Sequence, residues 1–471
     1  MPQYLAFDFG AESGRAILGT ISGGRLALEE IHRFPNTPVR LPTGLYWDTL
    51  RLFHEIRHGL AICAREKAKQ LDGIGIDTWG VDFALLGPDG ALVDNPRHYR
   101  DPRTNGMLKR VFEAVPREEL FSRTGIQFMD INSLCQWYAL KLNQSPALRI
   151  ADKLLFMPDL FSYWLTGIAK CERSIASTSQ FYDPRAHIWA TDILDRLGLA
   201  ASILPEIIST GSRLGTLLPE IADFSGLPAD TPVYATAGHD TASAVAAVPA
   251  SSTNWCYISS GTWSLMGVET DAPVINEDAL AMNFTNEVGA GGTIRLLKNI
   301  AGLWLLQECR RDWALKGREY SYEELTRLAA EAPPSKTILN PDVFLQPGHM
   351  PDQIVKYCND TGQSVPEQPG PMCRTILESL AHTYKKVLDM LERLIGCRIE
   401  TIHIVGGGSR NQLLNQLTAD ITRRAVIAGP SEATAAGNVL VQAIGSGTIS
   451  GLEEARDVIR RSFPPQSFSP R

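Results

Sequence analysis

The stretch LAFDFGAESGRAIL, residues 5–18, decides the expected fold. An apolar segment ends near Asp8, a turn containing Gly10 follows, and a second apolar segment begins after Arg15. This pattern predicts two strands joined by a tight glycine turn. A carboxylate beside such a turn is a candidate ligand for the magnesium ion that accompanies nucleotide phosphates.

The residues that follow extend this start into three strands, a helix and a buried strand. Residues 25–34 alternate apolar and polar side chains, Asp48 precedes apolar residues at helical spacing, and residues 73–80 (GIGIDTWG) form an apolar run. A dinucleotide-binding fold would instead alternate strand and helix from its first element. Residues 81–93 (VDFALLGPDGALV) are predicted to form a hairpin over a Pro-Asp-Gly turn.

A second glycine hairpin divides the chain into two expected domains, residues 1–248 and 249–471. It lies at residues 256–268 (CYISSGTWSLMGV), directly after a segment at 249–255 that is typical of a domain joint. Near the end of the chain, residues 401–421 read as a strand, three glycines and a helix. The two hairpins indicate two related domains, each opening with a turn of the size that binds phosphate.

Composition narrows the class of protein. The chain has 471 residues and a formal net charge of −7, which argues against nucleic acid as its main partner. Its eight cysteines include no CxxC pair, so no zinc site is indicated. Residues 241–268 carry no charge, but Pro249 and Gly261 favour a turn-rich core over a membrane span. We expect a cytoplasmic protein with reduced thiols, without a signal peptide or a membrane partner.

Nucleotide binding is indicated by three glycine turns and not by a standard motif. The sequence has no P-loop, no complete GxGxxG and no HRD loop of the kind found in protein kinases. The turns lie at residues 10–15, 261–264 and 406–409. Their backbone amides can surround phosphate oxygens, and the third turn leads into a helix N-terminus, which favours negative charge. The alternative is that all three are ordinary tight turns.

Asp240 is the candidate catalytic residue, because it lies where an expected strand (231–238) gives way to an expected helix (239–248). A carboxylate there either caps the helix or accepts the proton of a hydroxyl during phosphoryl transfer, and the two roles are compatible. His239 either bonds a sugar hydroxyl or is a turn residue. Trp79, Asp82 and Phe83 are candidates for the lining of a sugar pocket, with a core role as the alternative for Trp79.

At these residues the chain resembles the FGGY carbohydrate kinases. The resemblance covers nearly the full length and is carried by FDFGAESGR (7–15), MPDLFSYWLTG (157–167), ASTSQFYDP (176–184) and HDTASA (239–244). Within that family, IDTWGVDFALL, YISSGTWSLMG and HIVGGGSRNQLLNQL are similar to the members that phosphorylate L-rhamnulose. The resemblance implies a two-domain α/β actin-like ATPase (ribonuclease H-like) fold with ATP in an interdomain cleft.

The resemblance also implies roles at matching positions. Asp240 would be the proton acceptor, and Asp8 would lie near Mg²⁺. The sugar contacts would be Gly80, His239, Asp240, Thr241 and Asn299, to which the residue pattern adds Asp82. The ATP contacts would be Ala11, Glu12, Ser13, Gly14, Arg15, Thr262, Gln307 and Gly407. Two positions depart from the family: Glu12 replaces a small residue of many relatives, and Cys171-Glu172 replaces a Thr-Asp pair, so the latter two receive no role.

The expected reaction is therefore transfer of the γ-phosphoryl group of ATP to the 1-hydroxyl of L-rhamnulose. Two alternatives remain open. One is a kinase for another ketose, such as L-fuculose or a xylulose. The other is an actin- or chaperone-like ATPase that acts on protein partners, which the acidic and aromatic IDTWGVDF run and Asp240 disfavour. The sequence does not distinguish a monomer from a homodimer.

Overall fold

The computed structural model describes residues 1–471, and its contacts divide the chain into two units. The first unit comprises Met1–Ala247, Glu269–Leu296 and Ala433–Ser462, and the second comprises Val248–Val268, Leu297–Glu432 and Phe463–Arg471. Two segments from the later half of the chain thus belong to the first unit. The sequence analysis placed a single domain boundary after residue 248. The two units are instead defined by contacts and combine separate segments of the chain, so that boundary stays a prediction.

The first unit is built on a sheet with strand order β13-β14-β6-β1-β2-β3. The chain enters it through β1 (Gln3–Phe9), β2 (Ser13–Ser22) and β3 (Arg25–Pro35), and after α1 (Thr49–Glu66) it adds β6 (Gly73–Thr78). This order confirms the predicted start of the fold. Asp48 caps α1 as expected, since its carboxylate accepts a hydrogen bond from the Arg51 amide at 3.3 Å.

The predicted hairpin at residues 81–93 forms, but its second strand is reduced to a bridge. The Gly87 amide donates to the Ala91 carbonyl and the Val93 amide to the Leu85 carbonyl, both at 2.9 Å, and these bonds make an antiparallel bridge between Leu86 and Leu92. Strand β7 (Phe83–Leu86) has its longer pairing with β8 (Lys153–Phe156). The apolar side chains of β8 are buried, so this pairing places the apolar β7 in the core.

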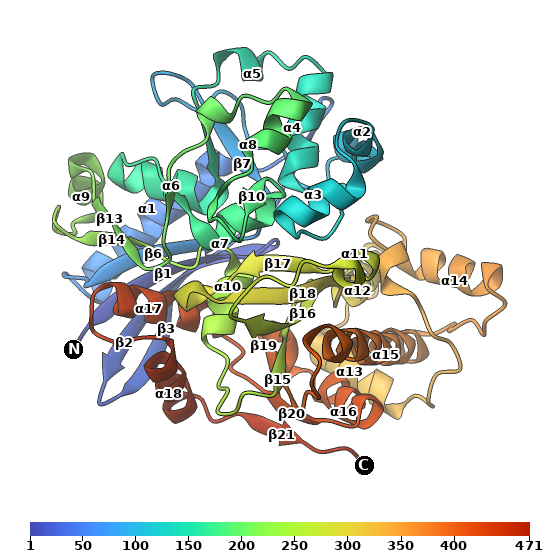
Figure 1. Cartoon of the computed structure of the whole chain (residues 1–471). Coiled ribbons are helices and arrows are strands. Elements are labelled where there is room, and N and C mark those ends of the chain that lie inside the picture. Colours follow the sequence, from blue (N-terminus) through green and yellow to red (C-terminus); the bar gives the residue numbers. More distant parts are fainter. The chain divides into compact units, whose positions relative to one another are not determined.

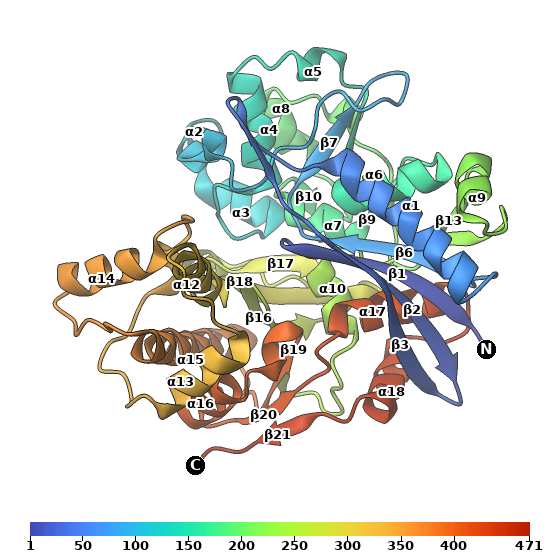
Figure 2. The same cartoon turned by 180° about the vertical axis from the view of Figure 1, so that it is seen from behind.

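Helices cover both faces of the first sheet, as Figures 1 and 2 show. Gly59 of α1 lies against Phe7 and Ala16, which are cross-strand partners and therefore share a face. Gly19 lies against Val439 of α17 (Ala433–Gly445), and its odd spacing from Ala16 places it on the opposite face. Helix α17 also packs against α10 (Asp240–Ala246).

The remaining elements of the first unit complete this framework. The strands are β4 (Val39–Leu41), β5 (Gly44–Tyr46), β9 (Cys171–Glu172), β10 (Tyr182–Asp183), β11 (Ile188–Trp189), β12 (Ile207–Ile208), β13 (Ser212–Thr216), β14 (Pro232–Ala235) and β17 (Thr285–Val288). The helices are α2 (Met107–Ala114), α3 (Arg117–Thr124), α4 (Ser133–Leu142), α5 (Ala147–Ile150), α6 (Met157–Thr166), α7 (Arg173–Ala176), α8 (Thr191–Leu197), α9 (Pro219–Ser225), α11 (Glu277–Ala281) and α18 (Leu452–Ser462). Short 3₁₀ turns lie at Pro102–Thr104, Ser177–Ser179, Ala201–Ile203 and Ala290–Gly292.

The second unit repeats the strand order of the first. The second sheet has the order β17, β18 (Ile294–Ala301), β16 (Trp263–Thr270), β15 (Trp255–Ser260), β19 (Thr401–Val405), β20 (Ala425–Ala428) and β21 (Gln466–Phe468), and its last six strands correspond to the six strands of the first sheet. Strand β15 is antiparallel to β16 and parallel to β19, just as β1 is antiparallel to β2 and parallel to β6. The next strand is again parallel and the following one antiparallel. This shared topology supports the expectation of two related domains.

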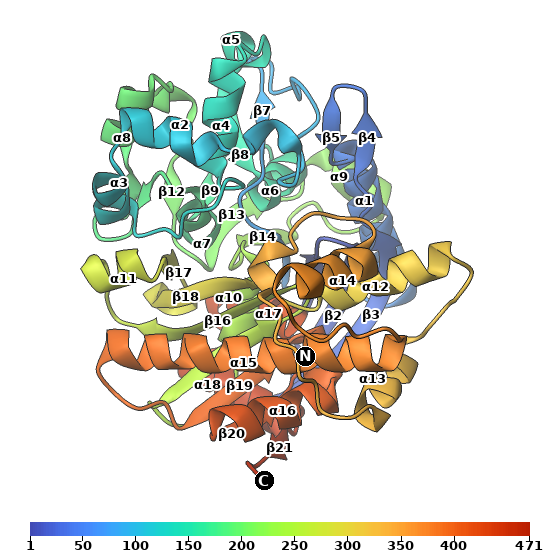
Figure 3. The same cartoon turned by 90° about the vertical axis from the view of Figure 1, so that its right-hand side faces the viewer.

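The longest helix of the second unit is α15 (Pro369–Ile395), which Figure 3 shows along its full length. It packs against α13 (Tyr322–Glu331) and α16 (Gln412–Thr422). The other helices are α12 (Trp304–Leu315) and α14 (Met350–Asp360), with 3₁₀ turns at Pro341–Val343 and Gly407–Arg410. No helix in the structure has the length and apolar character that a membrane crossing needs.

Candidate active site

Three aspartates lie at the carboxyl ends of parallel strands in the first unit. Asp8 is near the end of β1, Asp77 is near the end of β6, and Asp240 follows β14. Asp8 pairs in register with Asp77, and β14 runs parallel to β6, so all three residues belong to one edge of the sheet. Their charges also interact, because Asp8 and Asp240 both raise the pKa of Asp77.

The glycine turn after β1 is held by side chains that converge on it. Asp8 forms an ion pair with Arg15, its cross-strand partner on β2. Within the turn, the Gly10 amide donates to the Ser13 carbonyl at 2.9 Å. Asn36, which the sequence analysis did not identify, donates its side-chain amide to the Gly10 carbonyl at 2.8 Å and its backbone amide to the Glu12 carbonyl at 2.9 Å. These hydrogen bonds fix the conformation of the turn, and its contact with phosphate stays a prediction.

Gly14 and Glu12 of this turn have different surroundings. Gly14 lies against the Phe34 ring, and an added Cβ would come within 2.3 Å of that ring, so packing alone requires glycine there. Glu12 is exposed. The contacts predicted for Ala11, Glu12, Ser13 and Gly14 with ATP stay predictions.

Asp77 is a site residue that sequence reasoning missed. It is fully buried; one carboxylate oxygen accepts from the Asn438 side chain of α17 at 2.6 Å, and the other has no hydrogen-bond partner. Burial, reinforced by the charge of Asp8, holds the pKa of Asp77 well above its usual value. The signal in the sequence was a lone acid at the end of the apolar run GIGID.

Asp240 is the first residue of α10, and His239 occupies the cap position. Asp240 is therefore not the simple N-cap that the sequence offered as an alternative. Its carboxylate accepts from the Thr241 hydroxyl at 3.0 Å, and about a third of the side chain, 30%, remains exposed. Burial raises the pKa of Asp240 above its usual value; His239 and Thr241 oppose that shift, and Asp8 adds to it.

His239 is fixed by two charged residues that the sequence analysis did not identify. Its Nδ1 lies 3.0 Å from Glu287 Oε2, and its Nε2 lies 3.4 Å from Asp240 Oδ1. Arg295 Nη2 donates to the same Glu287 oxygen at 3.0 Å. Burial opposes ionisation of Glu287, but the charges of His239 and Arg295 outweigh it and lower the pKa of Glu287. When Nδ1 donates to Glu287, Nε2 faces Asp240 and the space beside it.

The loop after β6 brings Gly80 next to His239. A Cβ at Gly80 would lie 3.3 Å from His239 Nε2, which is tighter than most side-chain contacts. The next residue, Val81, has a φ of 68°, an uncommon conformation for a β-branched residue. The Val81 amide donates to the Thr178 hydroxyl at 3.2 Å, and the Ser133 hydroxyl donates to the Val81 carbonyl. The backbone of this loop is thus held in a strained conformation beside the candidate site.

Asp82 lies within the same loop but is fully buried. Its carboxylate accepts from the indoles of Trp47 at 2.6 Å and Trp79 at 3.0 Å, from Gln136 at 2.7 Å and from the Tyr99 amide at 3.2 Å. Burial raises the pKa of Asp82 to about 6 against the effect of these donors. Asp82 therefore orients the two indoles, and its direct contact with sugar stays a prediction.

The second unit contains four predicted site residues, namely Thr262, Asn299, Gln307 and Gly407. The turn after β15 is closed by a hydrogen bond from the Gly261 amide to the Trp263 carbonyl at 2.8 Å, and the Gly302 amide donates to the Thr262 carbonyl at 3.1 Å. Gln307 lies in the first turns of α12, and its buried Oε1 has no hydrogen-bond partner.

Gly407 begins a short 3₁₀ turn after β19, and a Cβ there would meet nothing within 4 Å. A side chain at this position would therefore project into open space, and the contact of Gly407 with ATP stays a prediction. The glycines do not lead directly into the helix, as the sequence suggested. Asn411 stands between them and caps α16 by accepting from the Leu414 amide at 3.0 Å.

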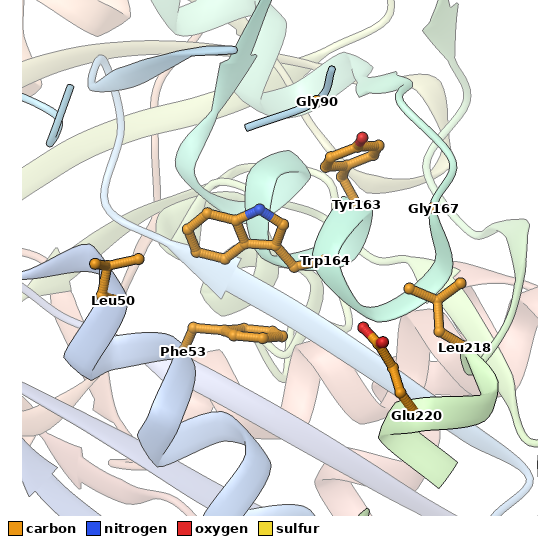
Figure 4. A pocket seen from close by; sticks show the side chains of 8 residues that line it. All are labelled: Leu50, Phe53, Gly90, Tyr163, Trp164, Gly167, Leu218 and Glu220. Atoms are coloured by element: carbon orange, nitrogen blue, oxygen red, sulfur yellow. The ribbon is translucent and has the colours of Figure 1, made fainter. Parts of the chain in front are cut away.

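A pocket elsewhere in the first unit contains none of the predicted site residues. Figure 4 shows Phe53 and Trp164 facing one another there, with Leu218 and Glu220 nearby. The two rings meet edge to face with centroids 5.0 Å apart.

Family models match both halves of the chain. The N-terminal domain of the FGGY family of carbohydrate kinases matches residues 3–247, and the C-terminal domain matches residues 256–446. The chain belongs to the FGGY family of carbohydrate kinases. Its fold is accordingly the two-domain α/β fold of the actin-like ATPase type, as the sequence analysis expected.

Curated relatives of this FGGY kinase match it from end to end. A protein named rhamnulokinase from Bacteroides thetaiotaomicron is 48% identical, and the alignment covers 99% of this chain and 96% of the relative. A rhamnulokinase from Enterococcus faecalis is 41% identical, with 99% and 94% covered. One from Bacillus subtilis is 38% identical, with 99% and 95% covered.

Solved structures share the fold at low identity. A gluconate kinase from Lactobacillus acidophilus has a TM-score of 0.81 at 15% identity, covering 100% of this chain and 94% of that one. A xylulose kinase from Rhodospirillum rubrum has a TM-score of 0.79 at 19% identity, with the same coverage. A glycerol kinase from Plasmodium falciparum, solved with ADP, has a TM-score of 0.77 at 15% identity, also covering 100% and 94%. These likenesses establish the fold of this kinase and not its substrate.

Proposed function

We propose that this FGGY kinase transfers the γ-phosphoryl group of ATP to the 1-hydroxyl of L-rhamnulose, giving L-rhamnulose 1-phosphate and ADP. The observation that carries the proposal is the end-to-end match, at up to 48% identity, to relatives named rhamnulokinase. The protein is further proposed to act in L-rhamnose breakdown in the cytoplasm.

Asp240 is the proposed proton acceptor. The hydroxyl oxygen of the sugar attacks the γ-phosphorus, the bond from that phosphorus to the β–γ bridging oxygen breaks, and the hydroxyl proton passes to the Asp240 carboxylate. Its partial exposure supports this role, because a substrate can reach it. Its raised pKa supports it as well, because a base gains strength as its pKa approaches the working pH.

The sugar is proposed to lie against His239, Gly80 and Thr241. The Nε2 atom of His239, fixed by Glu287 through Nδ1, is a hydrogen-bonding group for a sugar hydroxyl. Gly80 leaves the room that a hydroxyl needs beside this ring. Asn299 of the second unit and Asp82 complete the proposed sugar contacts.

ATP is proposed to contact Ala11–Arg15 in the first unit and Thr262, Gln307 and Gly407 in the second. The unpartnered Oε1 of Gln307 supports this assignment, as does the open space at Gly407. Arg15 brings a guanidinium group that can pair with phosphate oxygens. The family pattern supplies the remaining contacts.

The carboxylates of the first unit fit the magnesium ion that the family implies. Mg²⁺ prefers oxygen ligands, and Asp77 presents a buried carboxylate oxygen without a partner beside Asp8. We assign Asp8 as the residue that holds the ion, with Asp77 next to it. When bound, the ion would neutralise charge on the phosphate oxygens.

A ketose panel tests the proposed function. Purified protein with ATP and magnesium should release ADP with L-rhamnulose much faster than with L-fuculose or D-xylulose, and the phosphate should appear on the 1-hydroxyl. Faster turnover of another ketose would reassign the substrate. ATP turnover that does not depend on any sugar would instead favour an ATPase of the actin or chaperone class.

A further inference from the structure

Glu172 is a buried acid that the proposed reaction does not use. It ends the short strand β9 and stands where the general family pattern has an aspartate, so the sequence analysis gave it no role. Only 2% of the residue is exposed. Its backbone amide donates to Asp159 at 3.0 Å, which fixes the start of the side chain.

The two carboxylate oxygens of Glu172 serve different neighbours. Oε1 accepts from the Ser174 amide at 2.8 Å and from the Thr210 hydroxyl. Oε2 accepts from the Ile175 amide at 3.2 Å, the Ser174 hydroxyl at 2.5 Å and the Gly238 amide at 3.0 Å. The bonds to residues 174 and 175 are the ordinary cap of α7, but the bond to Gly238 reaches 66 residues along the chain.

That long-range bond ends directly before the catalytic segment. Gly238 precedes His239, and the His239 amide donates to the Ser174 hydroxyl at 3.2 Å, which in turn donates to Glu172. The His239 carbonyl then accepts from the Ala242 amide at 2.7 Å at the start of α10. Glu172 thus holds the backbone on the N-terminal side of Asp240 by two routes, one direct and one through Ser174.

The site needs a carboxylate and a glycine. All five groups around the Glu172 oxygens are donors, and only a carboxylate presents two oxygens that both accept. A glutamine there would aim an NH₂ group at other donors. A Cβ at Gly238 would lie 3.2 Å from Glu172 Oε2, so glycine permits this close approach.

We propose that Glu172 is a positioning residue, which fixes the Gly238–His239 backbone and thereby the direction of the Asp240 carboxylate. This inference rests on the proposed function for Asp240. It predicts that loss of the Glu172 contacts slows phosphoryl transfer more than it weakens sugar binding, because a misplaced base acts on the transition state.

The kinetic experiment compares Glu172→Gln and Ser174→Ala with Thr210→Val as a matched control. Thr210 contacts the carboxylate through Oε1, away from Gly238. We expect Glu172→Gln to lower kcat by about 10- to 100-fold, the loss that small misplacements of reacting groups produce, with KM for the ketose within about 3-fold of wild type. Ser174→Ala should lower kcat less, and Thr210→Val should leave it within about 2-fold.

Hydrogen exchange by mass spectrometry supplies a readout that needs no turnover. In Glu172→Gln and Ser174→Ala, the peptide covering residues 236–243 should exchange faster than in wild type. In Thr210→Val it should exchange as in wild type. An unchanged rate in Glu172→Gln overturns the inference, and Ser174→Ala decides it if Glu172→Gln does not fold.

Equal losses in all three variants would also overturn it, because they would indicate a general stabilising role for this network. The wild type is first assayed on the ketose panel. If it phosphorylates none of the ketoses, the proposed function has failed, and the exchange experiment still decides whether Glu172 fixes residues 238 and 239. If the wild type is active and Glu172→Gln matches it, the positioning role alone has failed.

Discussion

The Asp240 carboxylate joins two properties that a general base needs. The Asp240 side chain remains 30% exposed, so a substrate can reach it. Burial raises its pKa above the usual value of an aspartate. Thr241 and His239 keep it oriented and favour its ionised form. At the scale of single residues, the proposed chemistry therefore depends on how neighbouring groups tune one acid.

We predict that Asp240→Asn slows phosphoryl transfer by about 10² to 10⁴-fold, because general bases contribute in that range. ATP affinity and the thermal midpoint should change little, since asparagine keeps an oxygen for Thr241. Steady-state ADP release measures the rate of transfer, and calorimetry measures the ATP affinity and the thermal midpoint. Asp278→Asn, an exposed acid in the first turn of α11, is the matched control and should keep full activity.

Asp240 also determines how kcat changes with pH. Its pKa is raised, so protonation inactivates the base as pH falls through that value, and the acid limb of kcat should lie above the pH at which an ordinary aspartate titrates. The limb should be missing in the residual activity of Asp240→Asn. Near-normal turnover of that variant would leave Asp240 only a structural role.

At the scale of elements, α10 is held in place by its contact with α17. Gly437 of α17 lies so close to α10 that an added Cβ would stand 1.7 Å from the Ser243 carbonyl oxygen. The helices can approach this closely only because Gly437 has no side chain. Since Asp240 begins α10, the fit between two helices controls the position of the proposed base.

We predict that Gly437→Ala lowers the free energy of unfolding by about 1–3 kcal/mol, as forced overpacking does. It should also lower kcat, because α10 must move. Denaturant unfolding and steady-state kinetics measure these effects. Gly451→Ala is the control, since a Cβ there would meet nothing within 4 Å. Unchanged stability of Gly437→Ala would contradict the packing argument.

A substitution in the turn at Gly407 tests the proposed contact of this element with ATP. The backbone conformation of Gly407 and the space around it accept a side chain, so Gly407→Val should fold normally. If ATP packs there, the branched side chain should weaken ATP binding at least about 10-fold and leave sugar binding nearly unchanged. Titration calorimetry with each ligand measures this, with Gly451→Val as the control. Equal ATP affinity in both variants would make the turn purely structural.

At the scale of the whole molecule, the proposed contacts are divided between the two units. Asp240 and His239 belong to the first, whereas Asn299, Gln307 and Gly407 belong to the second. The proposed transfer would therefore draw on residues of both units, and a sugar that favours the reactive state would be expected to speed ATP turnover.

We predict that ATP turnover is slow without L-rhamnulose and that an analogue lacking the 1-hydroxyl raises ATP hydrolysis, with water as the acceptor. Asn299→Ala should lose this stimulation, because its contribution comes from the second unit. Asn359→Ala, an exposed residue of α14, should keep it. Coupled-enzyme ATPase rates measure the effect, and equally fast hydrolysis without sugar would refute the coupling.

Features that depend on residues close together in the chain could be predicted from the amino-acid order. Two apolar segments around the Gly10 turn predicted β1 and β2, the alternation in residues 25–34 predicted β3, and Asp48 with the helical spacing after it predicted α1. The position of Asp240 also followed from a local pattern. Capping, strand periodicity and turn formation act over a few residues, so they can be read along the chain.

Contacts between residues far apart in the chain became known from the folded structure. Asp77 meets Asn438 across 361 positions, and His239 meets Glu287 and Arg295 from a segment that returns to the first unit. The pairing of β7 with β8 belongs to the same class. Burial and long-range hydrogen bonds select these partners once the sheet has formed, and no local periodicity in the sequence specifies which acid meets which amide.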